Sequence, residues 1–72
     1  MVTGDDQGLV IAVLGLGEAG SAIAGDLAAA GVRVRGYDPA VTAAGAVLDT
    51  ASEAEAAHGA HLVLSVNSAK AA

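Results

Sequence analysis

The chain has 72 residues, a net charge of −5 and no cysteine, so it can form one small domain but no disulfide bond and no thiolate metal site. Its basic residues, Arg33, Arg35 and Lys70, do not make the basic patch that nucleic-acid binding requires. Asp5 and Asp6 stand where a signal peptide carries positive charge, and no apolar run approaches the roughly 20 residues that span a bilayer. We therefore expect a soluble cytoplasmic protein that binds neither nucleic acid nor membrane.

The first part of the chain predicts a lead-in, a buried strand and a turn. Residues 1–8 are polar and contain glycine, which is typical of a disordered segment at a chain end. Residues 9–14 are continuously apolar and rich in β-branched side chains, a pattern that favours a strand buried on both faces. Residues 15–20 are rich in glycine, and we expect them to form the turn out of this strand.

A helix and a second strand are expected next. Residues 19–30 are mostly good helix formers. Ile23, Leu27 and Ala30 recur at a helical spacing that predicts a stripe facing the core. Residues 32–38 read Val-Arg-Val-Arg-Gly-Tyr-Asp, and this alternation of apolar and charged side chains has the period of two that is typical of a strand.

Shorter elements are predicted in the remainder. Residues 41–44 indicate a helical turn, and residues 46–48 indicate a brief third strand. Ser52 is a suitable N-cap for a helix over residues 53–58, whose glutamates suit the positive end of the helix dipole. Residues 62–66 are apolar and predict a last strand.

Strands that alternate with helices predict an α/β fold with a parallel sheet and right-handed crossovers. We therefore expect a partial Rossmann fold over residues 9–72, with about four strands and crossover helices.

The glycines of the turn have the G-x-G-x-x-G spacing of a dinucleotide-binding motif, and they lie between a predicted strand and a predicted helix. In such a motif Gly15 permits the tight turn, Gly17 allows a pyrophosphate to approach the backbone, and Gly20 lets the helix pack closely on the strand. Leu16 can lie over the adenosine side of the crevice. The alternative is that these residues form a glycine turn that binds no ligand, since the chain has ten glycines.

Asp38 ends the second predicted strand, 23 residues after Gly15, close to the offset of about 20 that the motif expects. A carboxylate there can accept hydrogen bonds from the ribose hydroxyls of NAD and would repel the 2′-phosphate of NADP. Pro39 follows, and Arg33 and Arg35 precede Asp38 within the strand, so no arginine stands where that phosphate would lie. We expect NAD rather than NADP. Without the glycines, Asp38-Pro39 would indicate only a turn.

The segments "IAVLGLGEAGSAIAGDLAAAGVRVRGYDP" and "GAVLDTASEAEAAHGAHLVLSVN" together resemble the N-terminal cofactor domain of the 6-phosphogluconate dehydrogenase and 3-hydroxyisobutyrate dehydrogenase family, the β-hydroxyacid dehydrogenases. The resemblance covers nearly all of the chain from Leu9 onward. It implies an oxidoreductase that transfers a hydride between a nicotinamide cofactor and a small hydroxy acid.

Carried over by position, the resemblance assigns two groups of cofactor-binding residues besides Asp38 at the adenosine ribose. The pyrophosphate loop would contain Gly15, Leu16, Gly17, Glu18 and Ala19, and the loop near the nicotinamide-side ribose would contain Val66 and Asn67.

The family's catalytic segments and helical second domain have no counterpart in this sequence, and Lys70 lies in an alanine tail without a matching motif. We therefore expect a truncated cofactor domain with no catalytic residue of its own. Two other interpretations stay open. The chain could be the cofactor domain of another Rossmann enzyme, such as a prephenate-dehydrogenase-like or pyrroline-carboxylate-reductase-like protein. It could also be a fragment that binds no nucleotide and self-associates through an exposed sheet edge.

Other chemically active side chains are expected to be structural. His58 and His61 fall at a helix end and a strand start with no third metal ligand in sight. Ser65 lies within an apolar strand with no predicted base beside it.

Overall fold

The computed structural model describes residues 9–66, so the predicted lead-in at residues 1–8 lies outside the described part. Its elements in chain order are β1 (Val10–Leu14), α1 (Glu18–Ala29), β2 (Arg33–Tyr37), β3 (Leu48–Asp49), α2 (Glu53–Ala57) and β4 (Leu62–Ser65). The four strands of this part form one parallel sheet in the order β3-β2-β1-β4. The predicted α/β class with a four-stranded parallel sheet is confirmed.

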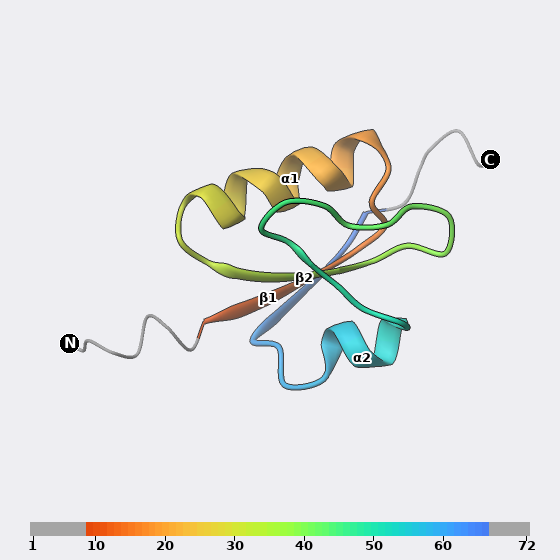
Figure 1. Cartoon of the computed structure of the whole chain (residues 1–72). Coiled ribbons are helices and arrows are strands. Elements are labelled where there is room, and N and C mark those ends of the chain that lie inside the picture. The colour runs from red at the N-terminus through yellow and green to blue at the C-terminus, as the bar shows by residue number, and fades with distance from the viewer. Residues whose placement is uncertain (1–8, 67–72) are drawn as a thin grey trace.

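The sheet is covered on both faces, with α1 on one and α2 on the other (Figure 1). Both helices pack mainly on β1 and β2. On the α1 face, Ile11 and Val13 of β1 form the core with Ala24 of the helix. On the α2 face the fully buried side chains are small ones, those of Ala12 in β1 and Ala56 in α2. The larger part of the apolar core therefore lies under α1.

α1 faces the sheet one position away from the predicted stripe. Gly20 and Ala24 are its buried residues, whereas Ile23 is 38% exposed and Ala30 is exposed. Leu27 does pack against the core. The reason is steric, since a Cβ at Gly20 would lie 1.8 Å from a backbone oxygen of the preceding loop. This close approach turns the smallest side chains of α1 toward the sheet and Ile23 away from it.

The helical turn predicted at residues 41–44 is wrong, because the chain there follows an irregular loop. The amide of Val41 donates to Asp38 Oδ1 at 3.1 Å, and the amide of Ala43 donates to Asp49 Oδ1 at 2.9 Å. Carboxylates at both ends of the segment therefore accept hydrogen bonds from its backbone and favour a non-helical turn there.

The third strand begins two residues later than predicted, and residues 46–48 contribute only Leu48 to it. Gly36 of β2 sets the pairing register, since it lies opposite Asp49. The next residue, Thr50, donates to the Gly36 carbonyl oxygen from both its amide (3.1 Å) and its hydroxyl (3.0 Å). These bonds fix where β3 pairs with β2.

α2 forms close to its predicted bounds and has the predicted cap. Ser52 Oγ accepts a hydrogen bond from the Glu55 amide at 3.0 Å, and Glu55 Oε1 accepts one from the Ala51 amide at 2.5 Å. This reciprocal arrangement is a variant of the capping box, and it explains how so short a helix begins at a defined residue.

β1 and β4 differ in burial although both are apolar in sequence. Residues Val10 to Val13 are buried, as predicted for the first strand. β4 lies at an edge of the sheet, where Leu62 is 50% exposed and Val63 is 42% exposed. In the part of the chain that the structure describes, neither helix has the length and apolarity needed to cross a membrane.

Val13 and Ile23 provide a test of how α1 lies on the sheet. Val13 has no exposed surface, and Val13→Ala should lower the free energy of unfolding by about 2 kcal/mol, because it removes two buried methyl groups and leaves a cavity. Ile23→Ala removes more atoms but should cost less than about 1 kcal/mol, since the side chain is partly solvated. Urea titration followed by far-ultraviolet circular dichroism measures both. A larger loss for Ile23→Ala would show that α1 presents the predicted stripe to the core.

Candidate functional site

Glycines shape the loop that joins β1 to α1. Gly15 has a φ of 100°, and its amide donates to the Tyr37 carbonyl oxygen at 2.8 Å. A Cβ on Gly15 would lie 2.0 Å from the Val66 carbonyl oxygen, and a Cβ on Gly20 would lie 1.8 Å from the Gly15 carbonyl oxygen. A Cβ on Gly17 would meet nothing within 4 Å. Packing within the chain therefore requires the first and third glycines, whereas the second borders open space.

Leu16 contributes its backbone to the loop and its side chain to the core. The side chain is 3% exposed, and its methyl groups lie where a Cβ on Gly36 would meet them at 3.0 and 3.1 Å. The structure thus places this side chain over β2 rather than over the crevice. The Leu16 carbonyl oxygen accepts a hydrogen bond from Ser21 Oγ at 2.7 Å, which links the loop to the first turns of α1.

Asp38 directs its carboxylate to the glycine loop. Its Oδ2 accepts from the Leu16 amide at 2.7 Å, and its Oδ1 accepts from the amides of Ala40 at 2.7 Å and Val41 at 3.1 Å. The hydrogen bond from Leu16 and then the one from Ala40 do most to hold the pKa of the Asp38 carboxyl below its ordinary value. The structure therefore brings Asp38 and the glycine loop together, as the sequence spacing predicts, and the carboxylate also closes the Asp38-Pro39 turn.

The N-terminus of α1 lies at this loop without a side-chain cap. Gly17 is the N-cap residue and has no side chain to accept a hydrogen bond from the first-turn amides. Glu18 and Ala19 begin the helix, and both are exposed. The amides of a first helical turn point out of the helix and carry its positive dipole end, so they are available to an anionic group.

Val66 follows β4 and borders the same loop. Its amide donates to the Leu14 carbonyl oxygen at 2.7 Å, and its own carbonyl oxygen is the atom that a Cβ on Gly15 would strike. Asn67, which the family resemblance assigns together with Val66 to the loop near the nicotinamide-side ribose, lies outside the described residues.

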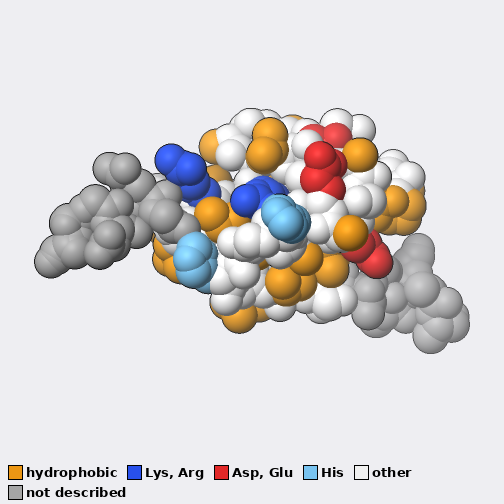
Figure 2. Space-filling model, turned by 90° about the horizontal axis from the view of Figure 1, so that it is seen from below, with side chains coloured by type: hydrophobic (Ala, Val, Ile, Leu, Met, Phe, Trp, Pro, Cys, Tyr) orange, Lys and Arg blue, Asp and Glu red, His pale blue; other side chains and the backbone are white. Residues whose placement is uncertain are grey.

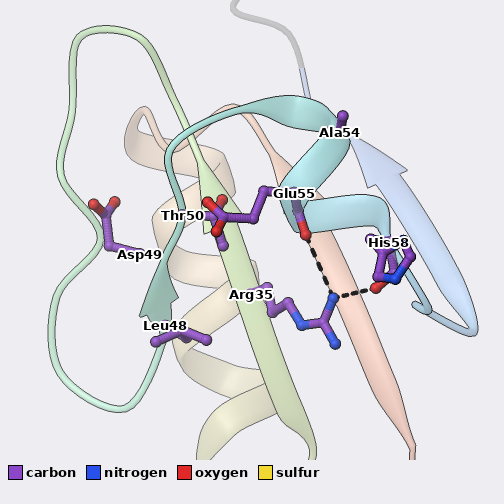
Figure 3. A pocket seen from close by; sticks show the side chains of 7 residues that line it. All are labelled: Arg35, Leu48, Asp49, Thr50, Ala54, Glu55 and His58. Carbon is purple, nitrogen blue, oxygen red and sulfur yellow. Dashed lines mark hydrogen bonds between the residues drawn. The ribbon is translucent and has the colours of Figure 1, made fainter.

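Arg35 lies in a hollow of about 630 Å³ on the α2 face, lined also by Leu48, Asp49, Thr50, Ala54, Glu55 and His58 (Figure 3). Its Nη1 donates to the carbonyl oxygens of Ala56 at 3.4 Å and Glu55 at 3.5 Å, and to that of His58. The guanidinium therefore caps the C-terminal end of α2, where the helix dipole favours a cation. Sequence reasoning missed this role, which alternation along β2 could have indicated by placing Arg35 on the face opposite Val34.

The histidines have structural partners. His61 Nδ1 accepts from the Val10 amide at 3.0 Å, while the His61 amide donates to the Val10 carbonyl oxygen at 2.8 Å, so this residue ties the start of β4 to the start of β1. His58 is the C-cap of α2. Within residues 9–66 no group of His, Asp and Glu side chains is arranged to hold a metal ion.

Comparison of the chain with protein-family models, with curated proteins and with solved structures finds no match.

Two glycine variants test whether the loop is tightly packed at Gly20 and open at Gly17. Gly20→Ala should lower the free energy of unfolding by at least about 2 kcal/mol, because the new Cβ overlaps a backbone oxygen that cannot move aside cheaply. Gly17→Ala should change it by less than about 1 kcal/mol, because the space in front of Gly17 is free. Chemical denaturation measures both. Equal losses at the two positions would contradict the loop geometry described above.

The lowered pKa of Asp38 makes a prediction about acid. A carboxylate whose pKa is depressed by folding contributes stability that is fully present above its ordinary pKa of about 3.9 and is lost as the pH falls through the lower folded value. Asp38→Asn should therefore lower the Tm at neutral pH, and the gap from the unsubstituted protein should close once the pH falls below the lowered pKa of Asp38. Asp26→Asn, on the exposed surface of α1, is the control for the loss of one negative charge. A gap for Asp38→Asn that persists in acid would mean that the carboxylate charge contributes nothing to these hydrogen bonds.

Proposed function

We propose that the chain binds NAD(H) at the loop between β1 and α1, as the cofactor-binding part of an oxidoreductase of the β-hydroxyacid dehydrogenase type. One observation carries the proposal. The 2.7 Å hydrogen bond from the Leu16 amide to Asp38 Oδ2 holds the acidic residue that follows β2 beside a glycine loop with open space at Gly17. A ribose acceptor beside a phosphate-accessible loop is the arrangement that the adenosine half of a dinucleotide needs.

The strand order supports this location for the site. The order β3-β2-β1-β4 is that of the first four strands of a doubly wound dinucleotide-binding sheet. In such sheets ligands bind outside the carboxyl ends of the strands, at the point where the order reverses. Here the reversal falls between β1 and β4, where the loop that begins at Gly15 meets Val66.

The pyrophosphate would lie against the backbone at Gly17. Three features fit it: the free space at this residue, the first-turn amides of α1, and the absence of a side chain that caps them. The exposed Glu18 adds a negative charge nearby, which stabilises the helix terminus in the free protein and opposes a bound anion.

Asp38 would bind the adenosine ribose with limited capacity. A carboxylate offers about four acceptor positions, and the amides of Leu16, Ala40 and Val41 already use three of them. One position remains, on Oδ2. A single ribose hydroxyl can therefore bond to Asp38 directly, and a second one must replace an amide of the turn after Pro39.

The same surroundings favour NAD over NADP. A 2′-phosphate would face the Asp38 carboxylate, whose lowered pKa keeps it charged. Pro39 offers no donor, and the guanidinium of Arg35 is bonded to the C-terminal carbonyls of α2 on the other side of the sheet.

When bound, NAD supplies hydride transfer at its nicotinamide ring. The residues of this chain bind and orient its adenosine half, and we assign no catalytic residue among them. The choice of the β-hydroxyacid class over other Rossmann dehydrogenases rests on the sequence resemblance alone. A cytoplasmic location is part of the same proposal, since a chain without cysteine suits a reducing compartment.

The test is a titration of the isotope-labelled chain with NADH, followed by amide NMR. We expect shifts at Gly15, Gly17, Gly20 and Asp38, together with Ala40 and Val41 because of the shared carboxylate. NADPH should bind at least about tenfold more weakly, because its extra phosphate faces a carboxylate without a compensating cation. Gly17→Ala should keep the spectrum of a folded protein and lose most of the affinity for NADH.

The matched control is Gly25→Ala, at an exposed glycine of α1 where an added Cβ would meet nothing within 4 Å, and it should leave the affinity for NADH unchanged. A folded chain whose glycine-loop amides do not move with NADH would overturn the proposal and leave the glycines as a turn. Shifts confined to the α2 face would also overturn it.

A further inference from the structure

The two edges of the sheet are unequal. β3 forms one edge with only two residues, Leu48–Asp49, and ends in a carboxylate. β4 forms the other edge with the four residues Leu62–Ser65. A very short strand and a charged side chain both protect an edge from pairing with another strand. Within residues 9–66, the β3 edge alone has this protection.

β4 is also open on both of its faces. Leu62 and Leu64 lie on the α1 face, because they pair with Ile11 and Val13 of β1, and Val63 lies on the α2 face. Since both helices pack mainly on β1 and β2, Leu62 stays 50% exposed and Val63 stays 42% exposed. Adjacent residues on opposite faces are thus both unburied, which an unpartnered edge strand explains.

Charge distinguishes this edge from the rest of the molecule. Residues 60–66 contain no Asp, Glu, Lys or Arg, although the whole chain carries a net charge of −5. In the view from the side of α2, the charged side chains gather in the upper half and at the right, while the lower margin is hydrophobic and uncharged (Figure 2). Two copies of an acidic chain repel each other at most orientations, and β4 is a surface on which they can meet without opposed carboxylates.

We propose that β4 pairs with β4 of a second copy of this chain, antiparallel and about a twofold axis normal to the sheet. Such an axis keeps the α1 faces of both copies on the same side, so residues that lie opposite each other must share a face. The central register puts Val63 opposite the partner's Val63 and Leu62 opposite the partner's Leu64. Each copy then contributes Leu62 and Leu64 to one apolar cluster on the α1 face.

This dimer is separate from nucleotide binding. Antiparallel pairing points the carboxyl ends of the strands in the two copies in opposite directions. The two glycine loops, which follow those ends, therefore lie on opposite sides of the joined sheet along the strand direction. The dimer forms whether or not the loop binds NAD(H), and either proposal can fail alone.

The experiment is sedimentation velocity of the full chain over a series of concentrations, with two lysine variants. We expect a monomer–dimer equilibrium, and Leu62→Lys should raise the dimer dissociation constant at least about tenfold, because it removes an apolar contact and sets like charges against each other. Leu48→Lys is the matched control, since Leu48 is 62% exposed but lies on the β3 edge. It should leave the constant unchanged.

The register is measured in a mixed sample in which only one copy carries isotope label. Contacts between methyl groups of Leu62 and the partner's Leu64 should appear in intermolecular NOE spectra. If Leu62→Lys fails to fold, Val63→Lys tests the same pairing from the α2 face, where the side chain is also partly solvated. A monomer at every concentration, an open-ended polymer, or equal effects of Leu48→Lys and Leu62→Lys would each overturn the proposal.

Discussion

Backbone crowding at the end of β1 is the constraint on which the rest of the structure depends. The carbonyl oxygens of Gly15 and Val66 lie where side chains on Gly20 and Gly15 would otherwise be. Because the start of α1 meets the loop at backbone contact distance, the helix can lie only with its smallest residues against the sheet. That placement buries Ala24 and leaves Leu16 to fill the space over Gly36. The core of this alanine-rich chain is thus built around close backbone approach rather than around large side chains.

The glycine loop is held in place by the chain itself. The Asp38 carboxylate binds the loop from the β2 side, and Ser21 Oγ binds it from the helix side, both through the backbone of Leu16. A loop whose geometry is fixed before a ligand arrives loses little conformational freedom on binding. The proposed cofactor site therefore depends on Asp38. Sequence motifs describe this residue only as a ribose acceptor, but here its carboxylate also holds the glycine loop through the Leu16 amide.

Sequence predicted the elements whose cause is local and missed those whose cause is distant. The glycine spacing and the capping Ser52 act within a few residues of themselves, so the loop and the start of α2 were predictable. The loop at residues 41–44 was not, because the Ala43 amide is taken by the Asp49 carboxylate, which the pairing of β3 with β2 holds in place. The orientation of Ile23 depends on the crowding at Gly20, and the exposure of β4 depends on its place in the sheet. Neither is visible in the local pattern of apolar residues.

The hydrogen bonds of Arg35 affect the order in which parts of the molecule unfold. Its hydrogen bonds to the C-terminal end of α2 join a guanidinium to backbone carbonyl oxygens and involve no carboxylate. The hydrogen bond between Asp38 and the glycine loop, by contrast, depends on a carboxylate that acid protonates. Acid therefore loosens the glycine-loop end of the sheet while this attachment of α2 persists. Amide hydrogen exchange at a pH low enough to protonate Asp38 would then be fastest around the glycine loop, so this loop and α2 behave as separate units of local unfolding.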